Sequence, residues 1–256
     1  MRLRLIVAYD GAEFSGWQSQ RGGGTVQDAL EAAFAKIAGT RITVHGAGRT
    51  DAGVHALGQC AHVEIPETLL PIHRWRQALN AHLPPAVRVM ATRRAPTSFH
   101  ARFSAVGKVY RYTIWNSEVM SPLENSRAWH VFHPLDISRV EAACQAFVGT
   151  HDFSAFSANR SKEEKSTIRQ LTDIRLSRRG PLVSLTFRGE GFLYKMVRMM
   201  TGAAVRCGMG RMDVDEIRER LRNRGPRWNH VAPAGGLCLV RVVYQERPSR
   251  FSTQVA

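Results

Sequence analysis

The sequence predicts an α+β (mixed α/β) fold made of two ferredoxin-like, or RRM-like, halves in which strands pair into sheets flanked by helices. Two observations lead to this prediction. The first part of the 256-residue chain has the pattern β-α-β-β-α-β, and a similar series of strands and helices follows it. We expect the halves to cover residues 1–100 and 101–246, joined near 95–105, and a flexible tail over 247–256.

In the first half, a strand over 2–9 is predicted from apolar residues at alternate positions, namely Leu3, Leu5, Val7 and Tyr9. Thr25 then caps a helix that ends at Gly39, because glycine readily adopts the left-handed conformation that closes a helix. Residues 41–46 and 57–65 predict two strands on either side of a glycine-rich loop. A helix over 71–81 and a strand over 87–93 complete the half.

The second half opens with a strand over 106–115, in which one face carries Val106, Tyr110, Tyr112 and Ile114. A helix is predicted over 137–148. A hairpin follows, with strands over 171–177 and 182–187 around a turn at 178–181. Helices over 193–207 and 215–222 and a closing strand over 237–244 complete the series.

The charge of the chain favours a polyanionic partner. Its 36 Lys+Arg and 21 Asp+Glu give a formal net charge of +15, which attracts phosphates at neutral pH. Nucleic acid is favoured over a membrane surface, because no basic amphipathic helix or lipidation site is evident. The candidate phosphate-binding residues are Arg178 and Arg179 at the hairpin turn, the loop 159–165, and Arg218, Arg222 and Arg224.

Nothing in the sequence has the form of a metal site or a membrane span. The four cysteines form no C-x-x-C pair, and the absence of a disulfide pattern favours a reducing compartment. His130 and His133 have no carboxylate or cysteine partner nearby. No stretch approaches the ~20 apolar residues of a spanning helix. We therefore expect a cytoplasmic protein without a bound metal.

The glycine-rich loop over 45–55 carries the strongest chemical signal. Three glycines frame one carboxylate and one guanidinium, at Gly46, Gly48, Gly53, Asp51 and Arg49. A dinucleotide loop would need glycine where Asp51 stands, and a phosphate loop would need Gly-Lys-Ser/Thr. An aspartic protease would need a second aspartate of this kind. Spacing alone leaves two interpretations: a carboxylate nucleophile or base, or a turn with a surface Arg-Asp pair.

This loop resembles the catalytic motif of the tRNA pseudouridine synthase A family. Five further groups of segments resemble that family in the same order: 9–11 with 14–18 and 25–27, 99–105 with 108–112, 151–153, 192–198, and 232–237. The resemblance covers residues 2–245. It implies the pseudouridine synthase fold, in which the two halves form one long, mainly antiparallel sheet flanked by helices.

The resemblance also implies an activity. Members isomerise uridine to pseudouridine at positions 38, 39 and 40 of the tRNA anticodon stem-loop. They use no cofactor and no metal, and they act as homodimers with one tRNA lying across both subunits. We therefore expect tRNA rather than DNA or a membrane as the partner. The alternative is a non-catalytic RNA-binding protein of the same fold.

Five residues receive roles from the resemblance. Asp51 is implied to be the catalytic carboxylate, attacking uracil C6, attacking ribose C1′ or removing the 2′ proton. Tyr110 is implied to stack on the target base, and its hydroxyl is a candidate for the proton step at C5. Arg198 is implied to pair with Asp51, and Arg49 to help displace the base. Leu237 is implied to form an apolar wall of the uracil pocket, although a core position would explain this leucine equally well.

Overall fold

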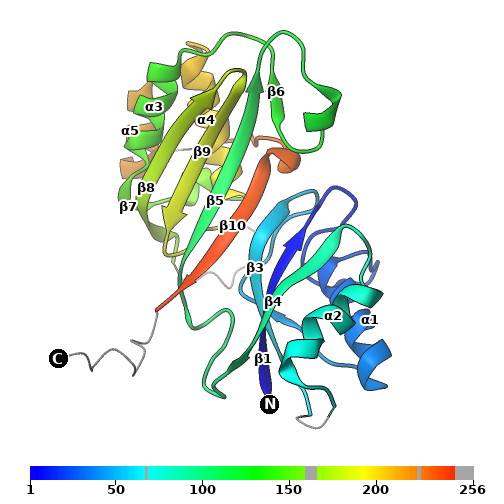
Figure 1. Ribbon diagram of the computed structural model, residues 1–256. Coiled ribbons are helices and arrows are strands. Elements are labelled where there is room, and N and C mark those ends of the chain that lie inside the picture. The colour runs from blue at the N-terminus through cyan, green and yellow to red at the C-terminus, as the bar shows by residue number, and fades with distance from the viewer. Residues whose placement is uncertain (67–68, 159–165, 224–225, 246–256) are drawn as a thin grey trace, which may run out of the picture.

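The computed structural model describes residues 1–66, 69–158, 166–223 and 226–245. Its strands form one sheet in the order β4-β1-β3-β10-β5-β9-β8-β7, with β2 paired to β3 and β6 to β5 (Figure 1). The strands are β1 (Arg2–Tyr9), β2 (His45–Gly46), β3 (His55–Glu64), β4 (Val87–Ala95), β5 (Ala105–Asn116), β6 (Trp129–Val131), β7 (Gly149–Asp152), β8 (Ile168–Arg179), β9 (Leu182–Gly189) and β10 (Leu237–Tyr244). The helices are α1 (Val26–Ala38), α2 (Trp75–His82), α3 (Ile137–Ala146), α4 (Met196–Gly208) and α5 (Val214–Asn223).

The strand order repeats between the two halves of the chain, which confirms the predicted fold class. β4-β1-β3-β2 in the first half corresponds to β10-β5-β9-β8 in the second. The pairing is antiparallel except for β5 with β6 and β10 with β3, where Cys238 and Leu239 lie opposite His55 and Ala56. The halves therefore join edge to edge, through β10, the last strand of the described residues, into one long, mainly antiparallel sheet.

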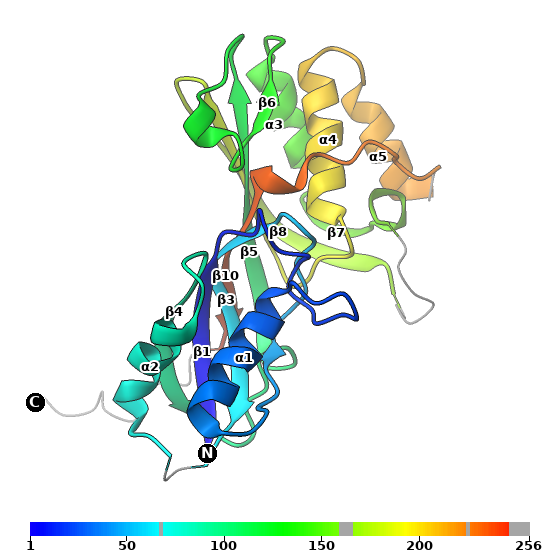
Figure 2. The same ribbon diagram turned by 90° about the vertical axis from the view of Figure 1, so that its right-hand side faces the viewer.

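Helices α1 and α2 pack on the first half and α3, α4 and α5 on the second (Figures 1 and 2). One hydrophobic core runs through both halves, with Leu5 of β1, Tyr112 of β5 and Met200 of α4 all fully buried. The alternating burial of β1 follows the alternating apolar residues of its sequence. Helix α1 begins where predicted, because Thr25 and Asp28 form a reciprocal capping box.

Four details differ from the sequence expectations. The strand expected over 41–46 is only His45–Gly46, and the predicted series did not include the short strands β6 and β7. Helix α4 begins at Met196 rather than at residue 193. The preceding Lys195 has a φ of 59°, a left-handed conformation that a helix cannot contain. Val106 is 42% exposed, so the predicted apolar face of β5 is not covered at this end of the strand.

The segment between the halves, residues 96–104, is packed rather than a free linker. The backbone N–H of Ala101 donates to His62 Nδ1 at 3.2 Å, and the hydroxyl of Tyr244 donates to the carbonyl of Ala101 at 2.7 Å. The domain limits 1–100 and 101–246 stay predictions, and the tail 247–256 lies outside the described residues. In the part of the chain that is described, no helix is both long and apolar enough to cross a membrane.

Candidate active site

The Asp51 loop lies between β2 and β3 and is held in place by the loop that follows β1. Trp17 N–H donates to the carbonyl of Thr50 at 3.1 Å, and Gly53 N–H donates to that of Phe14 at 3.3 Å. The two loops approach closely at Gly16, where φ is +93° and an added Cβ would lie 2.6 Å from the Thr50 carbonyl oxygen. Only glycine fits both the conformation and the space. The loop therefore presents Asp51 in a defined position.

Asp51 forms an ion pair with Arg198, from the first turn of α4. Arg198 Nη1 lies 2.8 Å from Asp51 Oδ2, and the side chains are 13% and 18% exposed, respectively. Arg198 Nε donates to the carbonyl of Ala232 at 2.8 Å, which fixes the guanidinium from its other side. A short, charge-assisted bond of this kind is made by the carboxylate anion. The pair brings a residue from each half of the chain into one site.

A cavity of about 440 Å³ opens beside this ion pair. Its walls include Asp51, Tyr110 of β5 and Leu237 at the start of β10. The Tyr110 ring meets the ring of Phe192 edge-on at a centroid distance of 5.1 Å. Burial, followed by the nearby Tyr9 and Asp51, raises the pKa of Tyr110 well above its ordinary value. Its hydroxyl is therefore protonated at neutral pH and can donate a hydrogen bond.

Arg49 also lines the cavity, with an exposed side chain. No ion pair joins it to another of the described residues. It is therefore available to an anion or a base that approaches from solvent. The structure thus brings all five predicted site residues together, Asp51, Arg49, Tyr110 and Leu237 around the cavity and Arg198 behind the carboxylate.

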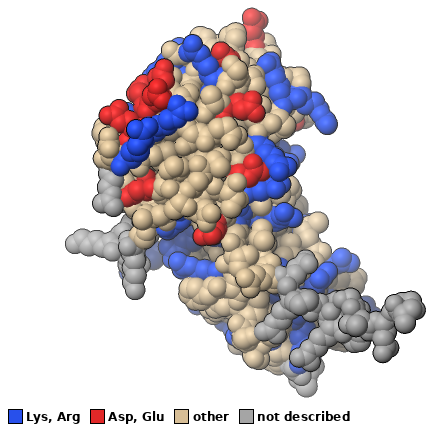
Figure 3. Space-filling view, turned by 90° about the vertical axis from the view of Figure 1, so that its left-hand side faces the viewer, with Lys and Arg blue, Asp and Glu red and all other residues tan. Residues whose placement is uncertain are grey.

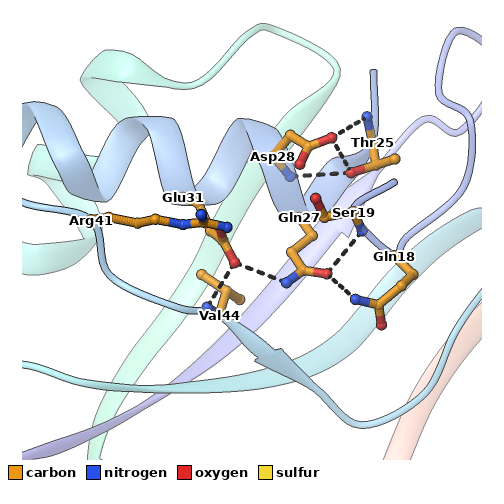
Figure 4. Close-up of polar contacts among 8 residues, drawn as sticks. All are labelled: Gln18, Ser19, Thr25, Gln27, Asp28, Glu31, Arg41 and Val44. Carbon is orange, nitrogen blue, oxygen red and sulfur yellow. Dashed lines mark hydrogen bonds and ion pairs between the residues drawn. The ribbon is translucent and has the colours of Figure 1, made fainter. Parts of the chain in front are cut away.

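A polar network around the buried side chains of Gln27 and Glu31 anchors the loop that supports this site (Figure 4). Gln18, which lines the cavity, donates to Gln27 Oε1 at 2.7 Å, and Gln27 Nε2 donates to Glu31 Oε1 at 2.8 Å. Glu31 also accepts from the backbone N–H of Val44 at 3.1 Å and pairs with Arg41 at 3.2 Å. Helix α1 is thereby tied to the loop that follows β1 and to the segment that leads into β2, directly before the Asp51 loop.

Comparison with known proteins identifies the family. A family model described as tRNA pseudouridine synthase matches residues 5–104 and 143–245. The chain belongs to the tRNA pseudouridine synthase family. It is therefore an isomerase that forms pseudouridine and has tRNA as its substrate.

Individual relatives agree with the family match. Proteins named tRNA pseudouridine synthase A from Akkermansia muciniphila and Acetivibrio thermocellus are 44% and 42% identical to this synthase. The alignments cover 96% and 94% of this chain and 96% and 99% of the relatives. A chain from a crystal structure of a Cbf5-Nop10-Gar1 complex superposes on this synthase at 13% sequence identity. The superposition covers 93% of this synthase and 48% of the other chain. Its TM-score of 0.39 is too low to support a conclusion.

One cavity residue of the synthase escaped the sequence interpretation. Lys108 of β5 lines the cavity, and burial, with a smaller contribution from Arg102, lowers its pKa to about 8. A signal for it was present in the sequence. Lys108 lies between Val106 and Tyr110 in the alternation that predicted an apolar face, where a lysine is unexpected unless it has a specific partner.

The predicted phosphate-binding residues of the synthase differ in their surroundings. Arg178 and Arg179 are exposed at the β8–β9 turn. Arg218 instead pairs with Asp215 at 2.6 Å, and the face that carries α3 and α5 mixes acidic with basic residues (Figure 3). The loop 159–165 and Arg224 lie outside the described residues. Within the described chain, no group of three or more His, Cys, Asp or Glu could hold a metal ion.

Proposed function

We propose that this synthase isomerises uridine at positions 38, 39 and 40 of the tRNA anticodon stem-loop, with Asp51 as its catalytic carboxylate. The observation that carries the proposal is the Asp51–Arg198 ion pair, 2.8 Å long, at the wall of a cavity of about 440 Å³. An anionic carboxylate fixed beside a nucleotide-sized space is suited to attack carbon or to remove a proton. The sequence motif around Asp51 supports the same assignment.

The reaction breaks the bond between N1 and C1′, turns the uracil, and joins C5 to C1′. A proton leaves C5 and N1 gains one, so the product is an isomer and no electrons are exchanged. A uridine within a stem must leave the stack to enter the cavity, at a cost of a few kcal/mol. Arg49 at the cavity wall would occupy the space that the base leaves. Asp51 would act at C6, at C1′ or on the 2′ proton.

Tyr110 and Leu237 would hold the uracil between an aromatic ring and an apolar side chain. Because the Tyr110 hydroxyl is protonated, we propose that it donates to the uracil. It is a poor base for the C5 proton, because abstracting that proton would require the phenolate that burial disfavours. The proposal also includes a cytoplasmic homodimer with one tRNA across both subunits. The family resemblance supports this part of the proposal, and the net charge of +15 supports the binding of tRNA.

Asp51→Asn tests the catalytic role. The amide keeps the shape of the side chain but removes the anion, so kcat should fall by ~10³-fold or more. The affinity for tRNA should stay within a few fold, since phosphate contacts supply most of it. Pseudouridine at positions 38–40 is measured by mass spectrometry after incubation with unmodified tRNA.

Asp215→Asn on α5 is the matched control, because it removes an exposed carboxylate far from Asp51 in the sequence and outside the cavity lining. It should retain wild-type turnover. If Asp51→Asn keeps normal turnover, Asp51 is not the catalytic carboxylate. If wild-type protein binds the anticodon arm but forms no pseudouridine there, the proposed substrate site is wrong.

A further inference from the structure

We infer that Lys108 binds a phosphate group adjacent to the target uridine and thereby positions the nucleotide for the Asp51 carboxylate. The inference rests on the proposed function, because it specifies which part of the RNA substrate Lys108 recognises at the cavity. Neither the family match nor the resemblance assigns a role to this residue.

The position of Lys108 places it on the wall that holds the base. It lies on β5 two residues before Tyr110, and alternation along a strand sends both side chains to the same face. In the sheet, Lys108 is opposite Val242 of β10 and Gly189 of β9. The side chains of Lys108 and Tyr110 both line the cavity that Asp51 lines.

The ammonium group of Lys108 packs against the Asp51 loop itself. A Cβ added to Gly48 would lie 2.5 Å from Lys108 Nζ, so the glycine leaves room for the ammonium group at the position that it occupies. Gln59 Nε2 donates to the carbonyl of Gly48 at 2.9 Å and fixes the loop at that point. Lys108 therefore lies next to the loop that carries the carboxylate, at Gly48, which is three residues before Asp51.

The cavity lacks an anion to balance this lysine. Its lining includes four cationic side chains, Arg49, Arg102, Lys108 and Lys195, and one carboxylate, Asp51. That carboxylate is already bonded to Arg198. No acidic group among the described residues pairs with Lys108.

The charged form of Lys108 is destabilised because its ammonium group is largely removed from water and has no counter-ion. The lowered pKa of Lys108 reflects this destabilisation. A phosphate would relieve it. A uridine within an RNA strand brings an uncharged base and a phosphate on each side, so the anion arrives with the substrate. Arg102, exposed at the cavity, is placed to share the same phosphate.

Lys108→Met, Lys108→Arg and the control Lys36→Met test the inference. Lys108→Met removes the charge at nearly constant length, whereas Lys108→Arg keeps it. Lys36 is exposed on α1 and outside the cavity, so Lys36→Met measures the effect of losing any one positive charge. Binding and turnover are measured on an anticodon stem-loop RNA, with and without a neutral methylphosphonate on the 5′ or the 3′ side of the target uridine.

We expect Lys108→Met to weaken RNA binding by about tenfold or more relative to Lys36→Met, as a lost charge-assisted contact does. Lys108→Arg should recover most of the loss. The methylphosphonate at one of the two positions should weaken wild-type binding by a similar factor or more, but should weaken Lys108→Met clearly less, because the Lys108 contact is lost in both changes and only the Arg102 contact remains to be removed. Thermal unfolding of each variant confirms that it is folded.

Equal binding by Lys108→Met and Lys36→Met would overturn the inference, and so would penalties that simply multiply at both methylphosphonate positions. A Lys108→Arg variant that is folded but as weak as Lys108→Met would also overturn it. Failure of the proposed function gives a different pattern, in which wild-type protein forms no pseudouridine in the unmodified stem-loop. If the wild type forms pseudouridine but the methylphosphonate and the Lys108 substitutions show no coupling, only the inferred phosphate contact is disproved and the proposed function stands.

Discussion

Arg198 is the residue on which the geometry of the site depends, because its guanidinium contacts two groups at once. Nη1 bonds Asp51 at 2.8 Å, and Nε bonds the carbonyl of Ala232 at 2.8 Å. The planar fork of arginine can make both bonds in fixed directions, whereas the single ammonium of lysine cannot. The orientation of the carboxylate therefore depends on more than the positive charge beside it.

Arg198→Lys should lower kcat by about 10- to 100-fold while KM for tRNA changes little, because a misdirected carboxylate loses transition-state contacts rather than substrate binding. Steady-state kinetics on unmodified tRNA provides the measurement. Arg206→Lys, in the last turn of the same helix, should leave both constants near wild type. A rise in KM with unchanged kcat would show that Arg198 serves RNA binding instead.

Single residues differ in how far the sequence could predict them. Asp51 and Arg49 lie within one motif, so their proximity follows from their spacing. The pairing of Asp51 with Arg198, 147 positions away, came only from the family resemblance and was confirmed by the contact. Lys108 was missed because its place beside Gly48 of the Asp51 loop depends on the tertiary fold, and local periodicity contains no information about it.

At the level of elements, the site depends on two loops that touch through glycine. An alanine at Gly16 would adopt an unfavourable positive φ and would place its Cβ 2.6 Å from the Thr50 carbonyl oxygen. Gly16→Ala should therefore lower the free energy of unfolding by about 2–3 kcal/mol. It should also lower kcat, because the Asp51 loop must shift to relieve the clash.

Urea unfolding and turnover of the same preparations test this expectation. The control is Gly22→Ala in the same loop, where an added Cβ would meet nothing within 4 Å. That change should alter stability by less than about 0.5 kcal/mol. Equal free energies of unfolding for Gly16→Ala and Gly22→Ala would contradict the expectation, because they would mean that the two loops move apart at Gly16 without loss of stability.

Most helices and strands were predictable because their signals are local. The capping box of α1 and the alternation of β1 are both read from a few neighbouring residues. The exceptions depend on distant partners. Residues 41–44 have a strand-like pattern, but β3 pairs only with His45 and Gly46 at that edge. Strand β6 exists because Trp129 to Val131 meet β5, a contact that no local pattern reveals.

For the whole molecule, one continuous core implies that buried ionisable groups act on the stability of the entire fold. Burial raises the pKa of Cys144 from 9.0 to about 12 and that of Cys207 to about 11. Burial also raises the pKa values of Tyr9, Tyr110 and Tyr112. Groups with a raised pKa in the folded state stabilise it fully below their ordinary pKa, and this contribution is lost as pH rises.

The free energy of unfolding should therefore fall between pH 9 and pH 11. Each buried thiol contributes a slope of about 1.4 kcal/mol per pH unit in that range. Lys108, whose pKa is lowered to about 8, acts in the opposite direction up to its ordinary pKa of 10.5, but it is one group against several. Urea unfolding at half-unit pH intervals gives the slope.

Cys144→Ala should reduce that slope by about 1.4 kcal/mol per pH unit between pH 9 and pH 11, whatever its effect on stability at pH 7. Identical slopes for the variant and the wild type would contradict the burial of this thiol.

The place of β10 has a consequence for how the enzyme is made. β10 lies between β3 and β5, joins the two halves and carries Leu237 into the cavity wall. On the ribosome, β3 and β5 are both synthesised long before β10. The growing chain can therefore fold much of each half while the cavity beside Asp51 is still incomplete. A basic nascent chain beside the ribosome is surrounded by RNA, and the wall that we propose to bind uridine is complete only when the strand that closes the sheet has emerged.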